Sequence, residues 1–548
     1  MKFSNIGWSK MNQNTKVFLV ITILFFSIYT LTSDGHRATS DEDFAQQQAL
    51  RIVLQEPDPE FVLGESGNFF KYPEFWYPYN PGGGENKCIY GILCYPIGIV
   101  YSVTEVPFVF LNHHLNFLTT ESVVFTVADF PDAHYVMWRN SVDPSHTFME
   151  LFYGPLFSSL SVGTFFLIAR SFNYKITTSL SLAFILGLAT IFFAYSQTSF
   201  NNPSSVFFVL AGFLFFKRFI DNQKILYSIA SAVLLVFGFM IRHDVVYVII
   251  PLFFFLILYV TFQKTWTLSS IIQKIKKIIS FTLPLLLGYE FERTIEAMRY
   301  SVEATTGIGT EVVTIATTFG RAGMVHGDVW AGMFGLLFSP GAGLFVFVPI
   351  LLTVFFAFPD FFRKNKLFTI LLLVIPSIYI IDFGSMNIWQ GYTAWSPKYL
   401  YVIIPFLLLP LGASIEKRGR KILLVIGILC CIGFIFNFSY IIQDVSWFVW
   451  GQPGGYEGLM KLAQGRSCVV YICPEVTWTF QYSQLTHSLH FALNNLHPDL
   501  FLLKLFGIQY YILTLVSVLS AEFYLLYRIL KPRTVSLKDY KENTEKNI

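Results

Sequence analysis

A cluster of carboxylates follows the first long apolar run of this chain. Asp34, Asp41, Glu42 and Asp43 all lie within residues 33–43. Ionisable side chains beside a hydrocarbon phase are costly to place there, and they are usually functional. A carboxylate can accept the proton of a hydroxyl group as a general base, or it can bind Mg²⁺ or Mn²⁺ as an oxygen ligand. Both kinds of chemistry are open to this cluster.

The same carboxylates also fit a structural role. Ser40 or Asp41 would serve as the N-cap of a helix, and acidic side chains are favoured in the first turn that follows. Apolar residues at helical spacing continue over residues 44–53, which predicts an amphipathic helix on the membrane. This interpretation leaves Asp34 without a role, so the rest of the chain must decide between catalysis, transport and helix capping.

The elements that must position these groups are membrane helices. The chain has 548 residues, of which 54% are hydrophobic and only 13% charged, whereas a soluble domain averages about 25% charged residues. Apolar runs of about 17–20 residues recur along the sequence, and each can cross a hydrocarbon core of about 30 Å. We predict an all-α polytopic membrane protein and exclude a soluble enzyme with one anchor. The net charge of +3 is too small to indicate nucleic acid as a partner.

About twelve membrane-spanning helices are expected. Their ranges are 16–32, 147–170, 176–196, 203–219, 225–240, 245–262, 278–295, 337–357, 367–383, 399–413, 422–441 and 505–528. The first is interpreted as a retained signal anchor, because residues 29–33 form a poor cleavage site. With both termini in the cytoplasm, each short inside connection is basic, as the positive-inside rule requires. The long segments 33–146, 296–336 and 442–504 then face outward.

One further apolar stretch, residues 89–111, is long enough to span. It contains Gly91, Pro96 and Pro107, which disfavour a straight helix. We expect an interfacial or re-entrant element there. A true span paired with a second one near residues 115–130 is the alternative.

The cysteines leave two possibilities open. Cys88 and Cys94 lie in the first outer segment, and Cys468 and Cys473 lie in the last one. Two short-loop disulfides on an oxidising face, or free thiols, fit equally well. No neighbouring His or Cys completes a zinc site around either pair.

Four blocks of the sequence resemble one known family. Residues 41–51 read DEDFAQQQALR, residues 90–96 read YGILCYP, residues 335–346 read GLLFSPGAGLFV, and residues 389–400 read WQGYTAWSPKYL. Together they resemble the GT-C superfamily of integral membrane glycosyltransferases, especially its protein-mannosyltransferase and aminoarabinose-transferase branch. In that family an Asp-Glu pair opens an outer interfacial helix, and boxes similar to the last two follow in order. The resemblance covers about residues 16–415.

The chain also departs from the family pattern. Lys398 stands where the family usually has Arg, which keeps a cation but loses bidentate geometry. Gly391 and Tyr392 replace a Gly-Gly pair, and residues 112–146 look like an insertion. No family roles are carried onto residues 442–504.

The resemblance implies a GT-C-type bundle that transfers a sugar. The donor would be a sugar linked to a polyprenyl or dolichyl phosphate, and the acceptor a hydroxyl group of a lipid, a glycan or a protein. Asp41 matches the catalytic position as general base, Glu42 its partner, and Asp34 is the reserve candidate. A metal-free base is preferred, with Mg²⁺ or Mn²⁺ as the alternative.

The departing polyprenyl phosphate develops negative charge, which fixed cations stabilise. Lys398 and Arg242 are the leading candidates for this role, and Arg321 is a weaker one; interfacial snorkelling is the competing explanation. The candidates for contact with the acceptor or the sugar are Tyr399, Trp395 and His243.

Three parts are therefore expected. Residues 1–441 form the transmembrane catalytic module with outer loops 33–146 and 296–336, residues 442–504 form an outer-face region, and residues 505–548 form the last span and a cytoplasmic tail. The active site would face the outside of the cell membrane. A transporter or flippase of lipid-linked sugars is the first rival, but it would need charges deep in the spans. A polysaccharide polymerase or ligase is the second, and only the boxes above argue against it.

Overall fold

The computed structural model of this chain describes residues 11–35, 45–46, 49, 52–53, 99–118, 144–262, 267–299, 327–386, 389–391, 395, 397–417, 419–442, 474–494, 498 and 500–531. Within these ranges every regular element is an α-helix or a 3-10 helix, in agreement with the all-α prediction. The elements are α1 (Gln13–Leu31), α5 (Ile99–Leu115), α6 (Pro144–Ser171), α7 (Ile176–Leu188), α8 (Ile191–Tyr195), α9 (Asn201–Asn222), α10 (Ile225–Ile241), η4 (His243–Val245), α11 (Val246–Thr261), α12 (Leu268–Arg299), α15 (Val329–Phe338), α16 (Leu344–Phe347), η5 (Pro349–Thr353), α17 (Val354–Phe362), α18 (Lys366–Gly384), η6 (Lys398–Ile403), α19 (Ile404–Leu408), α20 (Leu411–Lys417), α21 (Arg420–Ile441), α24 (Pro474–Trp478), α25 (Gln484–Asn494) and α26 (Phe501–Leu530).

Eight helices in the described part of the chain are long and apolar enough to cross a membrane. They are α1, α6, α9, η4 with α11, α18, η6 through α20, α21 and α26. Shorter apolar helices, α7, α10, α15 and η5 with α17, lie among them. The protein is therefore an all-α, multi-pass membrane protein, while the expected number of about twelve spans is not established by this count.

At least three of the predicted spans are interrupted, and one of them, 399–413, is divided among η6, α19 and α20. The range 176–196 is divided between α7 and α8, because Thr190 breaks the helix and its hydroxyl accepts a hydrogen bond from the Phe192 N–H at 3.2 Å. The range 337–357 contains the end of α15, the short α16 and the 3-10 helix η5, which begins at Pro349. Proline at the first position of a helix starts a new element rather than continuing the old one.

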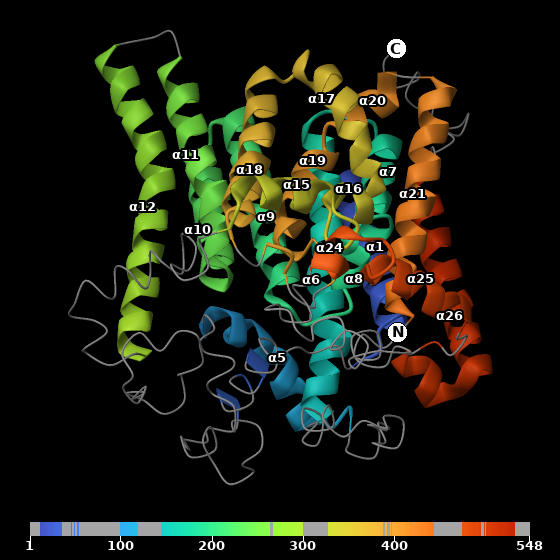
Figure 1. Cartoon of the computed structure of the whole chain (residues 1–548). Coiled ribbons are helices and arrows are strands. Elements are labelled where there is room, and N and C mark those ends of the chain that lie inside the picture. Colours follow the sequence, from blue (N-terminus) through green and yellow to red (C-terminus); the bar gives the residue numbers. More distant parts are fainter. Residues whose placement is uncertain are drawn as a thin grey trace, which may run out of the picture.

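Basic side chains lie at the ends of several helices. Arg363 and Lys364 lie between α17 and α18, Arg420 and Lys421 begin α21, and Arg528 and Lys531 lie at the end of α26. In Figure 1 the helices α17 and α20 and the upper end of α21 lie at the top, and α5 lies at the bottom. Of the stretch predicted to be interfacial, residues 89–111, only residues 99–111 are described, and these belong to α5.

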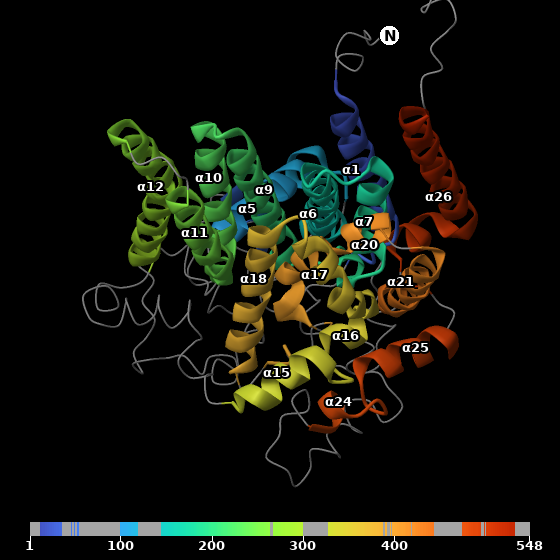
Figure 2. The same cartoon turned by 90° about the horizontal axis from the view of Figure 1, so that it is seen from above.

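The last helix is joined to the first. Figure 2 shows α26 beside α1 at one edge of the molecule, with α12 at the opposite edge. The Tyr511 hydroxyl donates a hydrogen bond to the Leu31 carbonyl at 2.9 Å, and the Phe501 N–H donates to the Ser33 carbonyl at 2.9 Å. The end of α1, directly before Asp34, is thus held by residues from the far end of the chain.

The glycines of the GLLFSPGAGLFV block allow a close junction between segments. A Cβ on Gly335 would lie 2.1 Å from the Trp389 ring, and a Cβ on Gly341 would lie 2.2 Å from the Val476 carbonyl oxygen. The Gly341 N–H also donates to the Thr477 carbonyl at 3.0 Å. This block, the tryptophan of the WQGYTAWSPKYL block and α24 therefore pack on one another, which explains why side chains are missing at these positions.

Candidate active site

A buried carboxylate on α6 holds the connection between α8 and α9, residues 196–200. Glu150 is 1% exposed. Its Oε2 accepts a hydrogen bond from the Ser199 N–H at 3.1 Å, and its Oε1 accepts one from the Ser199 hydroxyl at 2.5 Å. Buried carboxylates require such donors because an unpaired charge in a low-dielectric interior is very costly. The α8–α9 connection is therefore fixed by Glu150 at this point.

A second segment meets Glu150 from the N-terminal part of the chain. The Gln46 side-chain N–H donates to Glu150 Oε1 at 2.5 Å and to the Ser199 hydroxyl at 2.8 Å. Gln46 itself is fully buried, and the Tyr101 hydroxyl of α5 donates to the Ser199 carbonyl. Three parts of the chain therefore converge on one serine.

Of the four predicted carboxylates, Asp34 alone lies within the described residues. Asp34 is fully buried after the end of α1 and lies close enough to Glu150 for an electrostatic interaction. Asp41 and Glu42 lie outside the described residues, as does Asp43. The structure describes helical pieces at residues 45–46 and 49, within the range predicted to form an amphipathic helix.

On the other side of the α8–α9 connection lies Arg242, between α10 and η4. Its Nη1 donates to Asn201 Oδ1 at 3.0 Å and to Asn202 Oδ1 at 2.6 Å. Its Nε and Nη2 donate to the two carboxylate oxygens of Asp244, at 3.1 and 2.8 Å. Burial alone would lower the pKa of Arg242, but the Asp244 carboxylate raises it, and the net direction is upward. Arg242 is therefore a permanent cation with a fixed fork geometry.

Asn202 connects Arg242 to the segment of Lys398. The Asn202 side-chain N–H donates to the Lys398 carbonyl at 3.1 Å, while its oxygen accepts from Arg242. The Lys398 ammonium lies 4.5 Å from the centre of the Phe200 ring and forms no ion pair with another described residue. The structure thus joins the Arg242 guanidinium and the Lys398 backbone through one asparagine, and Arg321 lies outside the described residues.

Further polar groups surround Asp244. The Tyr379 hydroxyl of α18 donates to the Asp244 carbonyl at 2.8 Å, and the Tyr247 hydroxyl donates to Asp382 at 2.8 Å. His243 Nε2 lies 3.4 Å from Glu292 Oε1 of α12. The Arg242 region is therefore joined to α18 by hydrogen bonds, and it lies close to α12.

The two aromatic candidates of the WQGYTAWSPKYL block lie in the core. The Trp395 ring is 2% exposed and stacks on Tyr440, and its N–H donates to Asn437 at 3.2 Å. Tyr399 is 6% exposed and stacks on Phe383 with ring centres 4.6 Å apart. Trp395 thus packs on α21 and Tyr399 on α18, and neither ring opens to solvent.

Sequence reasoning missed the groups that connect these parts. They are Glu150, Gln46, Ser199, Asn201, Asn202 and Asp244. Glu150 carried a usable signal, because a carboxylate within an apolar run is a functional candidate in its own right. The polar run of residues 196–202 at the start of a predicted span was a second signal.

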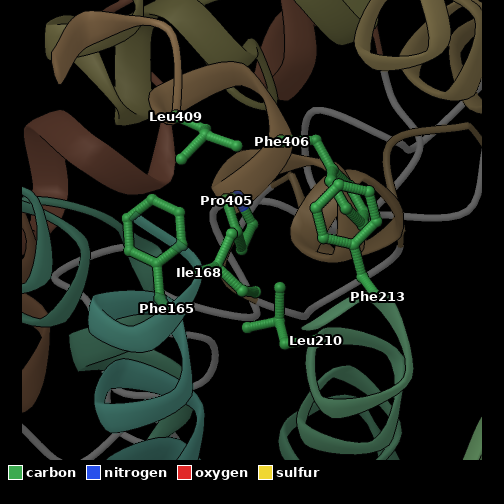
Figure 3. Close-up of a pocket in the computed structure, with 7 residues that line it drawn as sticks. All are labelled: Phe165, Ile168, Leu210, Phe213, Pro405, Phe406 and Leu409. Carbon is green, nitrogen blue, oxygen red and sulfur yellow. The ribbon is translucent and has the colours of Figure 1, made fainter. Parts of the chain in front are cut away.

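The described part of the chain holds no candidate metal cluster, and the pocket in Figure 3 is apolar. No group of three His, Cys, Asp or Glu side chains could hold a metal ion among the described residues. Figure 3 shows a pocket between helices that is lined by Phe165, Ile168, Leu210, Phe213, Pro405, Phe406 and Leu409. This lining is wholly apolar and offers no group for phosphate binding or proton transfer.

A known protein family matches a part of the chain that contains several residues of this site. Residues 147–284 match the family model described as dolichyl-phosphate-mannose-protein mannosyltransferase. The match confirms the predicted GT-C resemblance over that segment, which contains Glu150, Ser199, Asn202 and Arg242. No curated protein matches the chain.

Two solved structures show a weak likeness. The Archaeoglobus fulgidus oligosaccharyltransferase in its apo form is 11% identical, with a TM-score of 0.42 over 88% of this chain and 64% of that chain. The archaeal oligosaccharyltransferase AglB from Archaeoglobus fulgidus, in complex with an inhibitory peptide and a dolichol-phosphate, is 9% identical with the same TM-score and coverage. This chain spans 64% of the length of those proteins, and a likeness at that TM-score decides nothing about its function.

Proposed function

We propose that this protein is a membrane glycosyltransferase that moves a sugar from a polyprenyl-phosphate donor to an acceptor hydroxyl group at the outer face. The observation that carries the proposal is the bridge made by Asn202 between Arg242 and the backbone of the Lys398 segment. Asn202 lies at the start of α9, directly after the connection that Glu150 holds. Cations for a phosphate and carboxylates for a hydroxyl are both needed in such a reaction. The family match over residues 147–284 supports the same class of reaction.

Lys398 is the better candidate for direct contact with the donor phosphate. Arg242 already uses Nε, Nη1 and Nη2 on Asp244, Asn201 and Asn202. The Lys398 ammonium has a cation–π contact with the buried Phe200 ring, and such contacts are worth about 0.5–2 kcal/mol depending on desolvation. A phosphate would replace this contact by a stronger charge-assisted hydrogen bond, while Arg242 supplies a fixed positive charge and holds Asn202 in place.

The proton and the electrons move as follows in this proposal. The acceptor hydroxyl group gives its proton to Asp41, with Glu42 as its partner and Asp34 in reserve. The hydroxyl oxygen forms a bond to the sugar carbon, and the bond from that carbon to the phosphate oxygen breaks. The polyprenyl phosphate leaves with the electron pair and is stabilised by Lys398 and Arg242. The configuration at the sugar carbon is inverted.

His243 remains the proposed contact for the acceptor or the sugar. It is the neighbour of Arg242 in the chain, and its ring is 26% exposed. Trp395 and Tyr399, because they are buried, serve in this proposal as supports of the Lys398 segment. The site would open to the outside, because the basic connections lie at the opposite end of the bundle.

The proposal is tested by mass spectrometry of lipid extracts and glycans. A deletion strain is compared with strains complemented by the wild-type chain and by Asp41→Asn. We expect a polyprenyl-phosphate sugar to accumulate, and a glycan to lack one residue, in the deletion and Asp41→Asn strains alone. Full rescue by Asp41→Asn would refute Asp41 as the base, and glycans unchanged by the deletion would refute the transfer reaction itself. A truncated glycan in the deletion strain that Asp41→Asn fully restores would favour a transporter instead.

A further inference from the structure

Glu150 connects two halves of the site that no sequence motif links. On one side, Gln46 belongs to the segment that follows the predicted base Asp41. On the other side, Ser199 belongs to the connection that leads to Asn202, and Asn202 binds Arg242. Glu150 lies between these two sides and accepts hydrogen bonds from both.

We propose that Glu150 is a positioning residue, which holds Gln46 against the connection that leads through Ser199 to Asn202 and Arg242. The inference rests on the proposed function, but the contacts that carry it do not. Glu150 is 1% exposed and lies one turn inside the apolar part of α6. A carboxylate is retained there against a large desolvation cost, and only the hydrogen bonds to its two oxygens offset that cost.

The chemistry of the contacts explains why a carboxylate is needed. Oε1 accepts from Gln46 and from the Ser199 hydroxyl, and Oε2 accepts from the Ser199 N–H. A carboxylate has only acceptors, so all of these donors can bind it at once. A glutamine would present an amide N–H to at least one of these donors, and one contact would be lost. Glu150 is therefore suited to hold both segments at once, whereas its amide analogue can hold them only in part.

Small displacements of such segments have large effects on transfer. A misplacement of about 1 Å between reacting groups can lower a rate by about 10²-fold. We expect Glu150→Ala to lower kcat by about that factor while KM for the donor changes by less than about threefold. Glu150→Gln, which keeps one acceptor oxygen, should recover part of the lost kcat. Gln46→Ala should lower kcat as much as Glu150→Gln does. The double variant of these two should have a kcat no lower than the poorer single variant, because both substitutions remove the same hydrogen-bonded contact.

A second measurement tests whether Glu150 holds the Gln46 segment in place, and it needs no transfer reaction. Ala49, three residues after Gln46, packs with Val109 and with Met149 in one small apolar cluster. Ala49→Cys and Met149→Cys are introduced together into the full-length chain with its native cysteines replaced, and disulfide formation is followed in membranes. We expect a fast cross-link with Glu150 present, and a cross-link at least about fivefold slower in Glu150→Ala, because the Gln46 segment is no longer held.

The matched control is Glu522→Gln, which removes another carboxylate within a membrane helix. Glu522 of α26 accepts a hydrogen bond from Ser27 at 2.7 Å and has no part in the proposed site. We expect Glu522→Gln to keep wild-type kcat and a wild-type cross-linking rate. A wild-type kcat in Glu150→Ala would overturn the inference, and so would an unchanged cross-linking rate in that variant. Absence of transfer by the wild-type chain would overturn the proposed function and this inference with it, even if the cross-link still depends on Glu150.

Discussion

Arg242 and Asp244 face each other through two parallel hydrogen bonds, from Nε to Oδ1 at 3.1 Å and from Nη2 to Oδ2 at 2.8 Å. Their side chains are 11% and 10% exposed. The pair is nearly buried, and Nη1 of the same guanidinium is engaged by Asn201 and Asn202. Arg242 is thus the centre of a rigid arrangement, and the contribution of its pair with Asp244 to stability can be measured by mutation.

Removing one member of this pair should cost more stability than removing both. Arg242→Met leaves the Asp244 carboxylate buried and unpaired, which destabilises a protein by about 3–5 kcal/mol. The double variant Arg242→Met with Asp244→Leu should recover much of that loss, since apolar replacements of a buried pair are often neutral. Thermal unfolding in detergent measures both, and transfer should be absent in both. A double variant less stable than Arg242→Met would contradict this account.

Asp41→Asn should abolish transfer while the protein stays folded and inserted. An amide cannot take up the proton of the acceptor hydroxyl, and loss of a general base costs about 10²–10⁴-fold in rate. Turnover by the purified protein, with membrane abundance as the control, measures the effect. Asp34→Asn is the matched variant: wild-type turnover in Asp41→Asn with loss in Asp34→Asn would move the base to Asp34.

Lys398→Met should weaken use of the donor more than use of the acceptor. The substitution keeps a long unbranched side chain against Phe200 but removes the cation that we assign to the phosphate. We expect KM for the donor to rise or kcat to fall by about tenfold or more, since a charge-assisted hydrogen bond contributes about 1.5–3 kcal/mol. The control is Lys531→Met at the other end of the bundle. An unchanged donor dependence in Lys398→Met would remove Lys398 from the phosphate site.

Gly341→Ala should separate α24 from the junction described above. Its new Cβ would lie 2.2 Å from the Val476 carbonyl oxygen, which belongs to the backbone and cannot turn away. We expect a loss of about 1–3 kcal/mol in stability, as is usual for overpacking. Gly427→Ala in α21 is the control, because nothing lies within 4 Å of that position. Equal melting temperatures for the two variants would show that the contact at Gly341 is not tight.

Local pattern predicted much of the fold. Apolar run length located α1, α9, α10, α11, α18 and α21 to within a few residues, because each helix must match the thickness of a bilayer. The interruptions at Thr190 and Pro349 were missed, since a short break leaves the mean hydropathy of a run unchanged. The length of the apolar runs therefore predicted where these helices lie, but it did not predict where the spans are broken.

The site was predicted less completely, for a different reason. Arg242 could be proposed because a cation at the end of an apolar run is visible in sequence, and Lys398 because it lies in a block that resembles the family. Glu150 and Ser199 are 49 residues apart, and Asn202 and Lys398 are 196 apart. Their roles depend on contacts that only the folded chain creates. Hydrogen-bond partners so distant leave no periodicity by which a single sequence could reveal them.

The hydrogen bonds from Phe501 and Tyr511 to the end of α1 have a consequence for the order in which the protein folds during synthesis. A chain enters the membrane from its N-terminus, so α1 and Asp34 are in place long before α26 has been synthesised. The carbonyls of Leu31 and Ser33 receive these partners only at the end of translation. Asp34 therefore acquires its final surroundings last, and a nascent chain halted before α26 would be inserted in the membrane with the end of α1 still without these partners.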